Sequence, residues 1–182
     1  MRDYPVQTAS TAAQAARPVL EQVEQAFGMV PNIAGAMANS PELIQGFWSL
    51  FRQVHAGSFS EAEIQTLLLT NAVTNASGWA AAFHTMLALK EGLAPDDVQS
   101  IRSGRPPADA RLAALSDFAR KLIETRGHIS EDALDTFLNA GFSRAQSLEV
   151  LAVTAASTIT NYAGSITQPP LEDFLRQHAW QG

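Results

Sequence analysis

The sequence contains no cysteine. This absence excludes disulfide bonds, thiolate metal sites, iron–sulfur clusters and any reaction that depends on a protein thiol. Basic residues are also scarce, because 12 Lys and Arg stand against 18 Asp and Glu and give a formal net charge of −6. A negative surface repels phosphate backbones, so we expect no nucleic-acid partner.

Long apolar runs and strong surface charge are missing as well. The most apolar stretches, 64–73 and 148–159, are too short to cross a bilayer, and the first residues lack the apolar segment of a secretory signal. We therefore expect a cytoplasmic protein with no membrane partner. Charged residues make up 16% of the chain and hydrophobic residues 46%. This balance suggests that other subunits cover part of the surface, and we expect a homo-oligomer.

Helix start and stop signals recur along the chain, whereas strand patterns are absent. Proline or serine opens the segments, and glycine closes several of them; the openers are Pro18, Ser40, Ser60, Pro95, Ser130 and Ser143, and the closers are Gly28, Gly57, Gly92 and Gly141. Two of the starts are capping boxes, Ser60 with Glu63 and Ser143 with Gln146. These patterns predict an all-α protein, with a flexible N-terminal arm over residues 1–15 and one helical domain over residues 16–182.

Two segments of the sequence are similar to one another. Residues 59–62 (FSEA) match residues 142–145 (FSRA), and the Thr-Asn pairs at 74–75 and 160–161 are each followed by a glycine three residues later. An internal repeat of two helices would explain the match. Chance would also explain it, because the chain is rich in Ala, Ser and Thr.

Residues 60–92 hold the most informative polar positions. A capped apolar helix is followed by a break at residues 75–78 and by a second helix that carries Trp79, Phe83 and His84. Ser77 is placed to cap this second helix, and Ser77, Ala80 and His84 stand on one helical face. Backbone amides at a helix N-terminus attract anions, so a carboxylate ligand would suit this position.

The runs 59–64 and 75–84 resemble the core motif of the alkylhydroperoxidase-D-like, carboxymuconolactone decarboxylase superfamily. The closing runs 161–164, 170–173 and 179–180 resemble the end of its peroxidase-related branch. This resemblance implies an alkylhydroperoxidase-D-like helical bundle that assembles as a dimer, trimer or hexamer.

The redox-active motif of that superfamily contains a glutamate, an Asn, a Cys-x-x-Cys pair and a His. Asn75 and His84 match the Asn and the His, whereas Ser77 and Ala80 occupy the cysteine positions and Gln65 replaces the glutamate. Serine and alanine cannot reproduce thiolate attack and disulfide formation. Thiol-dependent peroxidase activity is therefore predicted to be absent.

The retained residues leave three functional hypotheses open. The resemblance implies non-redox acid–base chemistry, of the decarboxylase or lactone type, on a small carboxylated molecule. In that hypothesis His84 is the acid or base, Ser77 holds the anion, and four further residues bind the substrate or form the pocket wall, namely Asn75, Gln65, Trp79 and Phe83. The second hypothesis is a non-catalytic oligomeric binding or assembly protein, and the third is a residual hydroperoxidase or antioxidant role without cysteine.

Structural roles compete with each functional role. Ser77 could be only a cap, Trp79 and Phe83 only core residues, and His84 a buried structural histidine. The other histidines, His55, His128 and His178, lack partners at metal-ligand spacing, so we expect no metal. No glycine-rich phosphate loop occurs in the sequence, and we expect no cofactor.

Overall fold

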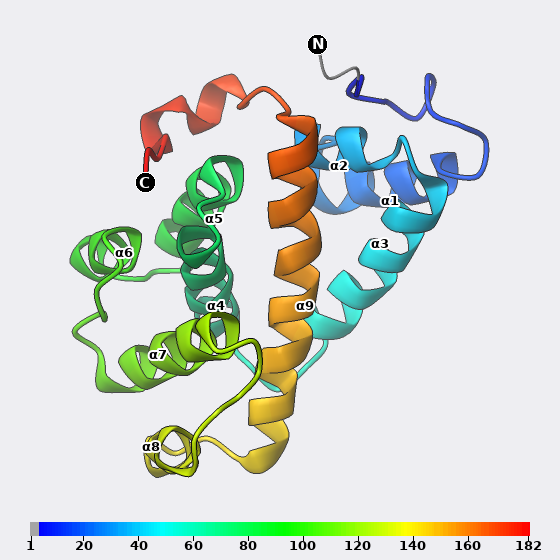
Figure 1. Cartoon of the computed structure of the whole chain (residues 1–182). Helices are drawn as coiled ribbons and strands as arrows, with labels where there is room; N and C mark the ends of the chain where they lie inside the picture. Colours follow the sequence, from blue (N-terminus) through cyan, green and yellow to red (C-terminus); the bar gives the residue numbers. More distant parts are fainter. Residues whose placement is uncertain (1–3) are drawn as a thin grey trace.

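Helices joined by short turns make up the computed structural model, which describes residues 4–182 (Figure 1). The α-helices are α1 (Arg17–Phe27), α2 (Asn32–Met37), α3 (Pro41–His55), α4 (Glu61–Thr74), α5 (Gly78–Lys90), α6 (Pro95–Arg102), α7 (Ala110–Glu124), α8 (Glu131–Asn139) and α9 (Arg144–Thr167), and a 3-10 helix, η1, covers Asp173–His178. Within residues 4–182 there is no β-strand, so the predicted all-α class is confirmed.

Helix α9 forms the centre of the architecture. It runs between α1 to α3 on one side and α4 to α7 on the other (Figure 1) and contacts α2, α3, α4, α5, α7 and α8. Only Arg144 and Glu149 are charged among its 24 residues. A helix with so few charges can pack against neighbours on several sides. None of the helices that the structure describes is long and apolar enough to cross a membrane.

Most of the predicted helix starts are confirmed. The hydroxyls of Ser40, Ser60, Ser130 and Ser143 each accept a hydrogen bond from the amide three residues later. These bonds satisfy amides that have no partner within the helix. Helix α2 has no comparable start signal, since its N-cap residue is Pro31, which has no polar side chain to accept a capping hydrogen bond. The sequence patterns did not predict this short helix.

The two similar segments share only their helix starts. Both begin with a capping box, and the rings of Phe59 and Phe142 pack edge to face at 6.0 Å. Helix α4 then ends at Thr74, whereas α9 continues through Asn161 without a break. The second part of the proposed two-helix repeat therefore has no structural counterpart.

Residues 4–16 lie against the helical body. The amide of Gln7 donates to the carbonyl of Gly35 at 3.1 Å, and Gln45 Nε2 donates to the carbonyl of Ala15 at 2.7 Å. Ala12 is buried. A Cβ at Gly35 would lie 2.6 Å from the carbonyl oxygen of Gln7, so the close approach requires glycine at this position. Flexibility of residues 1–15 stays a prediction, and residues 1–3 lie outside the described part.

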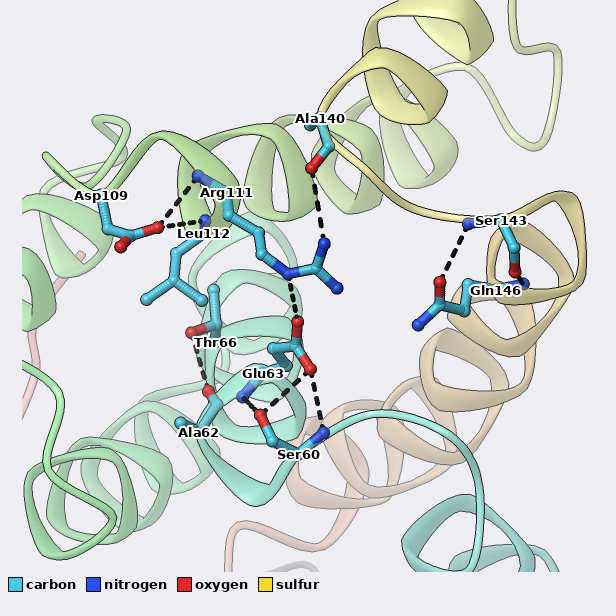
Figure 2. Close-up of polar contacts among 10 residues, drawn as sticks. All are labelled: Ser60, Ala62, Glu63, Thr66, Asp109, Arg111, Leu112, Ala140, Ser143 and Gln146. Carbon is cyan, nitrogen blue, oxygen red and sulfur yellow. Dashed lines mark hydrogen bonds and ion pairs between the residues drawn. The ribbon is translucent and has the colours of Figure 1, made fainter.

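A polar network joins the start of α4 to α7 and α8 (Figure 2). Glu63 Oε2 accepts from the Ser60 amide at 2.9 Å, while Glu63 Oε1 accepts from Arg111 Nε at 2.8 Å. The guanidinium of Arg111 lies 3.8 Å above the centre of the Phe142 ring and also donates to the carbonyl of Ala140. Burial raises the pKa of the Glu63 carboxyl, but the hydrogen bonds from Ser60 and Arg111 outweigh it, and the pKa lies below its ordinary value of 4.5.

This network predicts an acid-sensitive contribution to stability. Glu63→Gln keeps a capping box of the kind that Ser143 and Gln146 form, and removes only the charge that pairs with Arg111. We expect a loss of about 1 kcal/mol in the free energy of unfolding at pH 7. Because the pKa is lowered in the folded state, the contribution is present above pH 4.5 and is lost as the pH falls below it. Urea unfolding at pH 7 and pH 3.5 (approximately one unit below the ordinary pKa) measures the difference.

Asp117→Asn is the matched control, since Asp117 and Lys121 form an exposed pair on α7. Its effect should stay below about 0.5 kcal/mol. An equal loss for Glu63→Gln at both pH values would contradict the assignment.

Candidate functional site: an apolar cavity beside His84

The break between α4 and α5 positions the site. Asn75 ends α4, and its Nδ2 donates to the carbonyl of Asn71 at 2.9 Å. Ala76 adopts a positive φ of 51°, after which the amide of Ser77 donates to the carbonyl of Ala72 and α5 begins at Gly78. The tight turn packs α5 closely against α4. It brings His84 of α5 next to Gln65 of α4.

His84 is a buried, neutral imidazole. Its Nδ1 lies 3.0 Å from Oε1 of Gln65, which is also buried. An amide oxygen can only accept a hydrogen bond, so Nδ1 carries the hydrogen and Nε2 retains its lone pair. Burial, with a smaller effect from a positive charge on His55, lowers the pKa of His84 to about 3.

A cavity of about 60 Å³ lies beside His84 and is partly open to solvent. Its wall is mostly apolar and includes six large aromatic side chains: Phe27, Phe47, Trp48, Phe51, Trp79 and Phe83. Its polar groups come from His55, His84, Ser157 and Thr160. Of the described residues that line it, none is Lys, Arg, Asp or Glu. The cavity therefore suits an uncharged, largely apolar molecule.

Trp79 is held in place from the C-terminal segment. Its ring stacks on Phe83 at 4.9 Å, and its Nε1 donates to Oε2 of Glu172 at 2.9 Å. The other carboxylate oxygen of Glu172 accepts from the amide of Asn32 at 2.7 Å, at the start of α2. Glu172 is buried, so these two hydrogen bonds connect the segment before η1 to both α2 and the cavity wall.

Ser77 does not share this cavity, and that part of the sequence-based expectation is wrong. Ser77 lines a separate, more polar pocket with Gly78, Gly164 and Gln168. Its hydroxyl lies 3.8 Å from the point where a Cβ at Gly164 would stand. Although Ser77 occupies the N-cap position of α5, its side chain accepts no capping hydrogen bond within the described chain. The hydroxyl is directed toward α9, away from the amides that it was expected to cap.

The other expected residues divide into two groups. Trp79, Phe83 and His84 line the cavity. Gln65 does not line it, but orients His84 through the hydrogen bond at Nδ1. Asn75 closes α4, and Ala80 is buried in a cluster with Leu69 and Ile101. Neither Asn75 nor Ala80 lines the His84 cavity that residues 4–182 form.

The sequence patterns missed His55, the last residue of α3. Its Nδ1 lies 3.0 and 3.1 Å from the two carboxylate oxygens of Glu61, the first residue of α4. Its ring packs on Phe51 at 4.2 Å and lines the cavity. The turn over residues 56–60 brings His55 and Glu61 together, and helical periodicity does not predict a contact between residues of two different helices. In the part of the chain that is described, no three His, Asp or Glu side chains gather as a metal site.

Solved structures with the same arrangement of helices identify the fold. A peroxidase-related protein from Ralstonia eutropha JMP134, described as an alkylhydroperoxidase AhpD core, has a TM-score of 0.83 and 18% identity over 94% of this chain and 93% of its own. This chain has the AhpD fold. A peroxidase-related protein from Silicibacter sp. TM1040 has a TM-score of 0.76 and 20% identity, with 95% and 92% covered.

A third protein with the AhpD fold has been solved with a bound small molecule. Debrominase Bmp8, in complex with 2,3,4-tribromopyrrole, has a TM-score of 0.78 and 17% identity, covering 96% of this chain and 94% of its own. No protein-family model and no curated protein matches the sequence. The expected alkylhydroperoxidase-D-like bundle is confirmed, and the absence of cysteine leaves no thiol for peroxidase chemistry on it.

The buried state of His84 predicts a specific acid response. An unfolded histidine binds a proton below its ordinary pKa of 6.5, whereas folded His84 stays neutral down to about 3. Stability should therefore fall as the pH is lowered through this window, by up to about 1.4 kcal/mol per pH unit. His84→Asn keeps a donor opposite Gln65 but does not titrate, so its stability should fall less steeply than that of the wild type. Denaturant unfolding at several pH values in this window measures both slopes.

His128→Asn is the matched control, because His128 is exposed on the turn between α7 and α8. The free energy of unfolding of this variant should fall with pH as steeply as that of the wild type. Parallel curves for the wild type and His84→Asn would show that His84 does not resist protonation in the folded protein.

Proposed function

We propose that this chain binds a small, uncharged and mostly apolar molecule in the cavity beside His84. The observation that carries the proposal is the cavity wall, which combines six aromatic side chains with two histidines and no charged group. Concave apolar sites with a few polar groups are typical of small-molecule binding sites. The polar groups would orient the ligand, while the aromatic rings would supply most of the contact area.

A carboxylated ligand is less well supported than a neutral one. A carboxylate in this cavity would lose its hydration without gaining a cation, at a cost of several kcal/mol. The amides at the start of α5, which were expected to hold the anion, lie beside the separate Ser77 pocket. A lactone or another neutral molecule avoids this cost.

Acid–base catalysis by His84 itself is also less well supported than binding. A pKa of about 3 makes His84 a base that is weaker than an ordinary imidazole by roughly a thousandfold or more. The decarboxylase or lactone-type reaction that the sequence resemblance implied therefore requires a stronger base than His84. Binding of a ligand in the cavity requires no base.

The ligand of one structural neighbour has the chemistry that this cavity favours. Bmp8 binds 2,3,4-tribromopyrrole, an apolar ring with a single N–H donor. The volume of about 60 Å³ holds only a few water-sized groups. A ring would therefore shift the half-buried Phe27 and Phe51 or extend through the open side of the cavity.

Thermal unfolding with two small probes tests the proposal. A ligand that binds only the folded state raises the melting temperature. We expect fluorobenzene to raise it and benzoate, which has a similar size and a negative charge, to leave it unchanged. Ala156→Val should remove the fluorobenzene effect, because Ala156 is buried and lines the cavity. Ala110→Val is the control, because Ala110 is exposed on α7, away from the cavity. Stabilisation by benzoate alone, or by neither probe, would contradict the proposal.

We also propose that the chain forms a homo-oligomer through α9. Leu148, Leu151 and Tyr162 are 69%, 51% and 57% exposed and lie on one side of this helix. Between residues 148 and 166 the only charged residue is Glu149. A two-fold contact between copies would bury this apolar face without bringing like charges together.

Light scattering during size-exclusion chromatography tests the α9 contact. We expect the wild type to elute as an oligomer and Leu151→Glu to shift it toward the monomer mass, since a charge at the contact opposes burial. Leu43→Glu, on the exposed part of α3, is the control and should leave the mass unchanged. A monomeric wild type, or an oligomer unaffected by Leu151→Glu, would contradict the proposal.

A further inference from the structure

His55 presents one ring nitrogen to a carboxylate and the other to the protein interior. Nδ1 faces Glu61, so Nε2 lies on the opposite side of the ring, where it is buried and finds no hydrogen-bond partner among residues 4–182. His55 also lines the His84 cavity. Buried polar atoms in proteins are nearly always hydrogen-bonded, so an unpaired nitrogen at a cavity indicates a place for a ligand donor.

We propose that Nε2 of His55, oriented by Glu61, accepts a hydrogen bond from a neutral ligand that carries one O–H or N–H group on an apolar ring. This inference rests on the proposed function, because it names the ligand class of the same cavity. It makes His55, and not His84, the histidine that recognises the polar group of the ligand.

The partners of the two histidines account for this difference. A carboxylate at Nδ1 fixes the tautomer that leaves the lone pair on Nε2, and it makes Nε2 a stronger hydrogen-bond acceptor. His55 has such a carboxylate in Glu61, whereas Nδ1 of His84 faces only the neutral amide of Gln65.

No covalent bond changes in this step. The O–H or N–H group of the ligand donates to the lone pair of Nε2, and the ligand stays neutral, as a cavity wall without Lys, Arg, Asp or Glu favours. Nδ1 of His55 remains directed toward Glu61.

A purely structural role explains only half of this geometry. Glu61 stands in the first turn of α4 and His55 in the last turn of α3, where each charge complements its helix dipole. Such a pair would join the two helices through Nδ1. It does not account for a buried Nε2 that has no partner among residues 4–182, on a side chain that lines a cavity.

Phenol and fluorobenzene are suitable probes, since they share a shape and differ in the O–H group. We expect the wild type to bind phenol at least tenfold more tightly, as measured by isothermal titration calorimetry. His55→Asn keeps a donor opposite Glu61 and removes Nε2, so it should lose this preference and still bind fluorobenzene. Phenol should also shift the ¹⁵N resonance of His55 Nε2 in histidine-labelled protein.

Two further variants separate the histidines. His84→Asn should keep the preference for phenol, and Glu61→Gln, which retains an acceptor but no charge, should reduce it severalfold. Loss of the preference in His84→Asn but not in His55→Asn would overturn the inference. If His55→Asn does not fold, an unchanged preference in Glu61→Gln would overturn it equally. Equal binding of both probes to the wild type would reject the inference alone, whereas binding of neither would reject the proposed function as well.

Discussion

The structure depends on the burial of polar side chains inside the α4–α5 pair. Five polar side chains of this pair are buried: Gln65, Thr70, Asn71, His84 and Thr85. A polar group loses its hydration when it is buried, so it needs a hydrogen-bond partner within the protein. Gln65 meets His84, and Thr70 lies 2.8 Å from Ser116 of α7. The first bond fixes α5 on α4 and the second fixes α7 on α4, because a shift along either contact would leave these buried groups unpaired. The position of His84 is thus a consequence of the hydrogen bonding of the core.

The cavity forms where this rigid pair meets α3 and α9. Large aromatic side chains from α1, α3 and α5 surround the space, and their packing leaves a gap at the two histidines. Glu172 fixes Trp79 from the C-terminal segment, and Glu61 fixes His55 from the start of α4. Trp79 and His55 are therefore each oriented by a residue outside the cavity wall, which is a common feature of binding sites with defined geometry.

Local signals in the sequence predicted most helices, because caps, prolines and glycines act over a few residues. Ser60, Ser130 and Ser143 are examples, and α2 was missed because no such cap marks it. Trp79, Phe83 and His84, which were expected at one pocket, all line the same cavity. Helical spacing failed for Ser77, whose hydroxyl is directed toward Gly164, a residue far away in the sequence. It also failed for His55, since the bond to Glu61 depends on how the chain turns between two helices.

The two histidines of the cavity differ in the side chain that faces Nδ1, which is a neutral amide for His84 and a carboxylate for His55. The sequence resemblance implies a glutamate where this chain has Gln65, and a carboxylate there would stabilise a protonated His84. The amide accepts the same hydrogen bond without supplying the charge, so burial dominates and His84 stays neutral. The carboxylate that pairs with a histidine of the cavity wall is instead that of Glu61, which lies outside the wall and faces His55. With no thiol and with an amide at position 65, the cavity has His55 as the histidine with a carboxylate partner, while His84 contributes a neutral polar surface.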